Sequence, residues 1–138
     1  IALNLDEEYF TQAHNQEQHT FRLLHYPALA EHEGKQHDEK RAGAHTDYGS
    51  ITLLFQDDIG GLEVKTKTGD WVAATPVADT IVVNIGDLMQ RWTNDVFTSN
   101  PHRVTQPEQS RHEDRYSMAY FCTSNKMHIV HMNTFFSI

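Results

Sequence analysis

The sequence predicts a mainly β protein, a sandwich or barrel with a few flanking helical turns near its N-terminus. Short runs rich in β-branched and aromatic residues recur at close spacing along most of the chain. Segments rich in Gly and Asp separate these runs, as expected for turns between strands. With 138 residues, the chain is long enough for one domain with a buried core.

The expected elements can be placed in chain order. Asn4-x-x-Glu7 is a helix start signal. Tyr9, Phe10 and Ala13 follow it as a short apolar face, so we predict a first helix here. The predicted strands are 20–26, 51–55, 62–66, 71–73, 80–85 and 115–121, with turns at 57–61 and 68–70, a charged loop at 30–42 and one helical turn within 87–93.

Composition excludes several classes of function. The net charge is −8 and basic residues form no cluster, which argues against nucleic acid as a partner. The longest apolar runs, such as 51–55, fall far short of the roughly 18 residues that span a bilayer, so we expect no membrane association. The acidic N-terminus shows no signal-peptide pattern, and Cys122 is the only cysteine, which indicates a reducing, cytoplasmic location.

Two histidines and an aspartate have the spacing of a metal site. Residues i and i+2 of an extended strand point to the same face, so His45 and Asp47 can bind one metal ion together. His102 follows 55 positions later (102 − 47) and is the candidate third ligand. Two imidazoles and a carboxylate on one side form the facial triad of non-haem Fe(II) oxygenases, which leaves the other side open. The same donors also suit Zn²⁺.

A candidate carboxylate clamp lies beyond the third ligand. Arg115 and Ser117 are again i and i+2 on a predicted strand, thirteen positions after His102 (115 − 102). A guanidinium matches a carboxylate bidentately, and a hydroxyl adds another donor. A metal triad with such a clamp fits a 2-oxo acid, whose one end chelates the metal. Between them, Asn84-Ile85-Gly86-Asp87 is interpreted as a strand end and turn rather than as a ligand.

Residues 40–123 resemble the core of the 2-oxoglutarate/Fe(II)-dependent dioxygenases, in the isopenicillin N synthase-like branch. The resemblance covers roughly 85 of the 138 residues. It rests on the collinear segments HTDYGSITLLFQDDIGGLEV, GDWVAATP, TIVVNIGDLMQRWTND, SNPHRV and RYSMAYF, with weaker similarity back to FRLLHYP. It implies a double-stranded β-helix (jelly roll) with the metal at its open mouth.

The resemblance also assigns roles to individual residues. It implies that His45, Asp47 and His102 are the catalytic iron ligands and that Arg115 and Ser117 bind 2-oxoglutarate. Tyr26 matches a family tyrosine that also reaches 2-oxoglutarate. Where the family usually has Asn two residues before this tyrosine, the chain has Leu24.

The reaction that the resemblance implies is hydroxylation or desaturation of a small organic substrate by dioxygen. Fe(II) is the cofactor, 2-oxoglutarate is the co-substrate converted to succinate and CO2, and ascorbate can serve as reductant. Two alternatives remain open: a metal-binding jelly-roll fragment without turnover, and a Zn-dependent hydrolase. The clamp at 115–117 argues against the hydrolase, which has no use for it.

Residues 1–138 are interpreted as a single catalytic core that lacks most of the family's N-terminal region. In the family, that region contributes helices that cover part of the barrel. We therefore expect exposed apolar surface and self-association through it.

Overall fold

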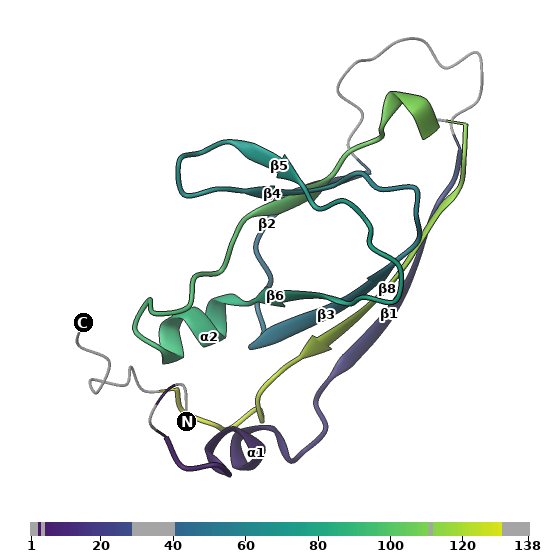
Figure 1. The fold of residues 1–138 in the computed structure, drawn as a ribbon. Helices are drawn as coiled ribbons and strands as arrows, with labels where there is room; N and C mark the ends of the chain where they lie inside the picture. The colour runs from purple at the N-terminus through teal and green to yellow at the C-terminus, as the bar shows by residue number, and fades with distance from the viewer. Residues whose placement is uncertain (1–2, 4, 29–40, 111, 131–138) are drawn as a thin grey trace.

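Two four-stranded antiparallel sheets form the body of the protein (Figure 1). The structure is a computed structural model that describes residues 3, 5–28, 41–110 and 112–130. The first sheet has the order β1 (Thr20–Tyr26), β8 (Arg115–Cys122), β3 (Ile51–Gln56) and β6 (Val82–Ile85). The second has the order β2 (Ala42–His45), β7 (His102–Val104), β4 (Leu62–Lys65) and β5 (Trp71–Ala73). This arrangement confirms the predicted jelly roll.

Strand β8 shows how the sequence pattern sets the two faces of the first sheet. Its residues alternate between buried and exposed, with Arg115, Ser117 and Ala119 facing inward. Tyr116 and Met118 face outward and are exposed. Polar side chains therefore occupy the inner face of a central strand, which is unusual for a packed core and marks the position of the site.

The sequence prediction of the strands was correct for six of the eight. The predicted strands 20–26, 51–55, 62–66, 71–73, 80–85 and 115–121 correspond to β1, β3, β4, β5, β6 and β8, with ends shifted by two residues at most. Strands β2 and β7 were not predicted as elements. Of the predicted loop 30–42, residues 30–40 lie outside the described residues, and Ala42 already belongs to β2.

The two α-helices lie close together at one end of the sheets (Figure 1). Helix α1 spans Tyr9–His14, so the start predicted from Asn4-x-x-Glu7 was too early; Asn4 itself lies outside the described residues. The Asp6 carboxylate accepts a hydrogen bond from the Glu8 backbone N–H at 2.9 Å, and this local turn delays the first helical residue. Helix α2 spans Asp87–Trp92, as predicted, and the 3₁₀ turn η1 spans Glu108–Ser110.

Trp92 joins the two helices. Its side chain is only 1% exposed, and its ring lies 6.0 Å from that of Tyr9 and 5.3 Å from that of Phe10. His14, which also belongs to α1, donates a hydrogen bond from Nδ1–H to the Phe10 carbonyl. Its Nε2 therefore accepts a hydrogen bond from the Ser50 hydroxyl, at 2.5 Å. Helix α1 thus supports the segment that leads into β3.

The outer face of the first sheet is apolar and exposed. Leu23 is 69% exposed, and Phe21, Val83, Tyr116 and Met118 are also exposed. No helix of the described segments lies across this face (Figure 1). None of the helices in these segments has the length and hydropathy that a membrane crossing requires.

Candidate metal centre

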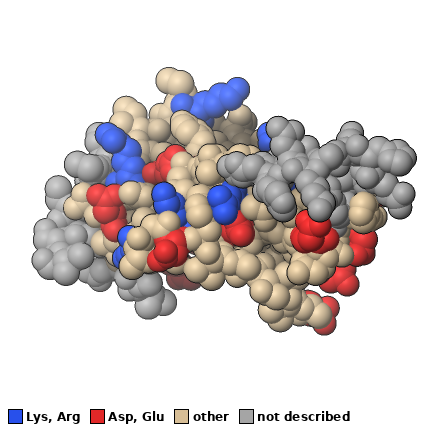
Figure 2. Space-filling view, turned by 90° about the horizontal axis from the view of Figure 1, so that it is seen from above, with Lys and Arg blue, Asp and Glu red and all other residues tan. Residues whose placement is uncertain are grey.

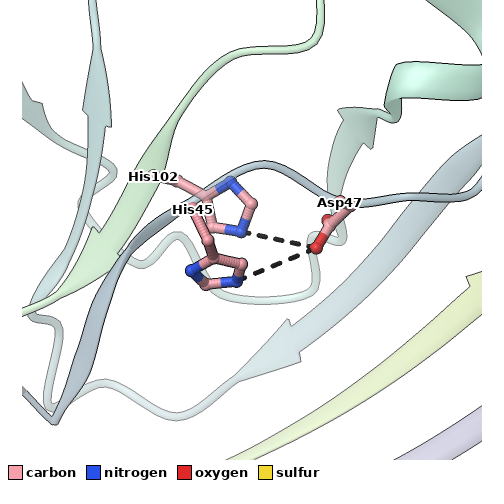
Figure 3. Close-up of side chains that lie close together, drawn as sticks. All are labelled: His45, Asp47 and His102. Atoms are coloured by element: carbon pink, nitrogen blue, oxygen red, sulfur yellow. Dashed lines mark ion pairs between the residues drawn. The ribbon is translucent and has the colours of Figure 1, made fainter.

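The structure brings His45, Asp47 and His102 together in one corner of the jelly roll (Figure 3). His45 and His102 are directly paired across β2 and β7, which places their rings 4.4 Å apart. Asp47 Oδ1 lies 3.9 Å from His45 Nε2 and 3.7 Å from His102 Nε2. One ligand atom from each residue lies within 4.8 Å of the others, which is the spacing of three donors around one ion.

Asp47 reaches this position differently from the sequence prediction. We expected His45 and Asp47 on one strand, but β2 ends at His45 and Asp47 lies in the segment that follows. Its backbone carbonyl accepts a hydrogen bond from Asp87 N–H at 2.7 Å, at the start of α2. Thr46 donates to the Asp87 carboxylate at 3.0 Å, so this helix end holds the ligand segment in place of a strand neighbour.

Backbone carbonyls orient both imidazoles toward the aspartate. His45 Nδ1–H donates to the Gly43 carbonyl at 2.8 Å, and His102 Nδ1–H donates to the Asn100 carbonyl at 3.2 Å. In each ring, Nε2 is therefore the nitrogen left to bind a metal. The His45 side chain is half exposed, whereas Asp47 is 6% exposed, so the centre is open to solvent on one side.

Asn84 fixes the carboxylate of Asp47. Its side-chain N–H donates to Asp47 Oδ2 at 2.8 Å, which leaves Oδ1 facing the two histidines. The interpretation of 84–87 as a strand end and turn agrees with the structure, in which β6 ends at Ile85 and α2 begins at Asp87. The orienting role of Asn84 was missed. The sequence does show an amide on a predicted strand, but the contact of Asn84 with Asp47 depends on how β6 pairs with β3.

Gly86 permits a close contact between the 84–87 turn and the backbone near Asp47. A Cβ atom here would overlap the carbonyl oxygen of Gly49 and would lie 3.1 Å from that of Asp47. The Gly86 N–H donates to the Ser50 carbonyl at 2.9 Å. The turn at 84–87 is therefore packed directly against the backbone that carries Asp47.

Arg115 is a buried cation in the same cavity. It is 1% exposed; its Nε donates to the Gly60 carbonyl at 2.7 Å, and its terminal nitrogens donate to Ser117 and Gln56, both at 3.3 Å. Burial lowers the pKa of the guanidinium, and the carboxylate of Asp57 partly opposes this effect. No carboxylate of the described residues forms an ion pair with Arg115. A buried, unpaired charge is costly, so this position favours an anionic ligand.

Tyr26 lies beside Arg115 in the structure. The two residues are paired across β1 and β8, and the Arg115 guanidinium lies 5.4 Å from the centre of the Tyr26 ring. Leu24, which replaces the family's usual Asn, is paired with Ser117. The leucine supplies an apolar wall where the family has an amide.

One cavity of about 280 Å³ unites these groups. Side chains of both sheets line it, including all six residues singled out from the sequence: Tyr26, His45, Asp47, His102, Arg115 and Ser117. Two imidazole nitrogens and a carboxylate oxygen fit Fe(II), and the buried guanidinium fits the distal carboxylate of a 2-oxo acid. The residues present are therefore compatible with both groups.

A jelly roll in which two histidines, an aspartate and a buried arginine line one cavity is typical of the non-haem iron oxygenases. Residues 17–124 match the family model of the 2OG-Fe(II) oxygenase superfamily. The protein belongs to this family.

Relatives with names and solved structures agree with this membership. The chain is 46% identical over 127 residues to proline hydroxylase buaE of Petromyces alliaceus, covering 87% of this chain and 39% of that protein. A full-length Neurospora crassa protein, crystallised in complex with alpha-KG and thymine, has a TM-score of 0.90 and 44% identity. This match covers 99% of the present chain and 42% of the Neurospora crassa chain. The present chain thus spans about two fifths of the length of these relatives.

Proposed function

We propose that the protein is an Fe(II)- and 2-oxoglutarate-dependent oxygenase that hydroxylates or desaturates a small organic molecule. The observation that carries this proposal is the meeting of three metal donors and one unpaired buried cation in a single cavity. The Neurospora crassa protein was crystallised with alpha-KG, which is 2-oxoglutarate, and this supports the same co-substrate here. In hydroxylation, one oxygen atom of dioxygen enters succinate and the other enters the product, and CO2 is released.

The chain's own residues have separate tasks in this proposal. His45, Asp47 and His102 hold the metal on one side, and Asn84 keeps the carboxylate turned toward it. Arg115, with Ser117, binds the distal carboxylate of 2-oxoglutarate. Iron, when bound, supplies the activation of dioxygen.

The cavity wall between the three candidate metal ligands and Arg115 is mostly apolar. Leu54, Leu62, Val64, Val82 and Val104 all line the cavity. Such a wall keeps water away from the reacting groups, which is the protein's main task when the cofactor supplies the chemistry.

Tyr26 is proposed as a further 2-oxoglutarate contact, because its ring borders the Arg115 guanidinium. Ascorbate is proposed as the reductant that keeps iron in the Fe(II) state. We further propose that residues 1–138 act as one catalytic core.

Partners and location complete the proposal. We propose a cytoplasmic protein without a nucleic-acid partner, because the net charge is −8 and Cys122 is the only cysteine. On the face shown in Figure 2, Lys and Arg residues are interspersed with Asp and Glu residues. Self-association through the apolar outer face of the first sheet is also proposed, and light scattering on residues 1–138 measures it directly.

The decisive experiment is substrate-independent turnover. The full-length protein, reduced and loaded with Fe(II), should release succinate from 2-oxoglutarate slowly even without an organic substrate. Zinc in place of iron, with no succinate, would instead favour the hydrolase. Bound iron and 2-oxoglutarate without any succinate would indicate a jelly roll that has lost turnover.

A further inference from the structure

A second arginine lies in the cavity and is used by neither the metal nor the clamp. Arg22 belongs to β1, lines the cavity and is exposed. Its guanidinium lies over the ring of Phe121, 5.4 Å from the ring centre. It makes no hydrogen bond or ion pair with the described residues, so its donors are free to bind a ligand.

Strand register separates this arginine from the clamp. Arg115 is paired with Tyr26, whereas Arg22 lies four residues earlier on β1, opposite Ala119. Four residues of a strand span about 13 Å, at roughly 3.3 Å per residue. A five-carbon dicarboxylic acid held at Arg115 with its other end at the metal does not also need Arg22. The second cation is therefore available to a different molecule.

Phe121 places this free cation near the metal. It is paired with Thr52 of β3, and Thr52 is paired with Asn84 of β6. Asn84 in turn donates to the Asp47 carboxylate. Phe121 therefore lies in the same row across the first sheet as Asn84, which contacts the candidate metal ligand Asp47. A molecule bound against the Phe121 ring would lie close to the candidate metal centre.

The charges in the cavity restrict what that molecule can be. Asp47 is the only carboxylate among the described residues that line the cavity, and it would be a ligand of the metal. An ammonium group, as in an amino acid, would find no counter-charge. The donors of Arg22 call for an oxygen acceptor, and the face of Phe121 calls for an apolar or planar surface.

We infer that Arg22 and Phe121 form the substrate-recognition site, and that the substrate is a planar ring with carbonyl oxygens, of the pyrimidine-base class. This inference rests on the proposed function. The ring lies against Phe121, and a carbonyl oxygen accepts from the Arg22 guanidinium. The Neurospora crassa protein was crystallised with two ligands of this class, thymine and 5-formyluracil.

Thymine, 5,6-dihydrothymine and L-proline distinguish the features of this site. Dihydrothymine keeps both carbonyls of thymine but has a puckered ring, and proline carries a carboxylate and an ammonium. Binding of each is measured by calorimetry on the full-length protein loaded anaerobically with Fe(II) and 2-oxoglutarate. We expect thymine to bind most tightly, dihydrothymine more weakly and proline least.

Variants at the two residues test their roles. Arg22→Gln should weaken thymine binding by about 10- to 100-fold, the scale of a hydrogen bond to a charged group, and Arg22→Lys should restore part of it. Phe121→Leu should weaken thymine more than dihydrothymine. Arg91→Gln on α2 and Phe55→Leu on the outer face of β3 are matched controls that should bind thymine like the parent. Succinate release without substrate should survive in both controls, because neither Arg91 nor Phe55 lines the cavity.

The possible outcomes distinguish a wrong substrate class, a wrong assignment of the two residues and a wrong proposed function. A parent protein that releases succinate but binds proline or dihydrothymine as tightly as thymine would overturn the inferred substrate class alone. Unchanged thymine affinity in Arg22→Gln and Phe121→Leu would overturn the assignment of the two residues. A parent that neither binds 2-oxoglutarate nor releases succinate would overturn the proposed function and, with it, this inference.

Discussion

Replacing Asn84 by Ala should weaken metal binding although Asn84 is not a ligand. The amide is the only side chain of the described residues that donates to Asp47, at 2.8 Å from Oδ2. Without it, the carboxylate, which is 6% exposed, loses the partner that keeps Oδ1 turned toward the histidines. Loss of an outer hydrogen-bond partner of a ligand typically costs about 10- to 100-fold in metal affinity. This range corresponds to about 1.4 to 2.8 kcal/mol.

The assay is an anaerobic competition titration of Fe(II) against a chelator of known affinity. Asn15→Ala is the matched control, because it removes an exposed amide at the end of α1, far from the metal ligands in the chain. Thermal melting of the metal-free proteins confirms that both variants fold. Equal iron affinity in Asn84→Ala and Asn15→Ala would show that Asp47 is held in place without the amide, and the orienting role would be refuted.

Three further predictions concern the ligand, the clamp and the contact beneath them. Asp47→Ala should abolish the visible charge-transfer band of the Fe(II)–2-oxoglutarate complex, because the only anionic protein ligand is lost; an unchanged band would contradict the triad. Arg115→Ala should weaken 2-oxoglutarate binding by a few kcal/mol, measured by titration, while iron affinity survives; equal loss of both would indicate a folding role. Gly86→Ala should lower the free energy of unfolding by about 1–3 kcal/mol in urea, because its Cβ meets backbone. Gly43→Ala, whose Cβ would meet nothing within 4 Å, should cost less.

The strands that the sequence predicted are those with a clear local pattern. Strand β3 is an almost continuous run of apolar and β-branched residues, ITLLF, and β8 alternates Arg115, Ser117 and Ala119 with larger apolar or aromatic residues; either pattern is enough to indicate a strand. Strands β2 and β7 have only four and three residues, with Gly43 in the former. Such short segments become strands because they pair with a neighbouring strand, and this pairing cannot be predicted from the local sequence pattern.

The candidate site shows the same division. Spacing alone identified His45 and Asp47 as neighbours, and the resemblance supported His102 as the third ligand. That His45 lies directly opposite His102 depends on the register of β2 against β7, which is set by the whole sandwich. The contact of Asn84 with Asp47 was missed for the same reason, since the two residues lie 37 positions apart in sequence.

Strand β8 also explains why a hydropathy pattern read by itself would misplace the core. Its sequence alternates Arg115, Ser117 and Ala119 with Tyr116 and Met118, and burial of the apolar set would turn the polar set to solvent. The structure does the opposite: the arginine and serine line the cavity and the tyrosine and methionine are exposed. Conflict between local pattern and burial is expected where a strand serves a site rather than a core. The register of β8 therefore buries the Arg115 cation and exposes the apolar residues of the opposite face at the same time. Burial of this cation becomes favourable when an anion binds beside it.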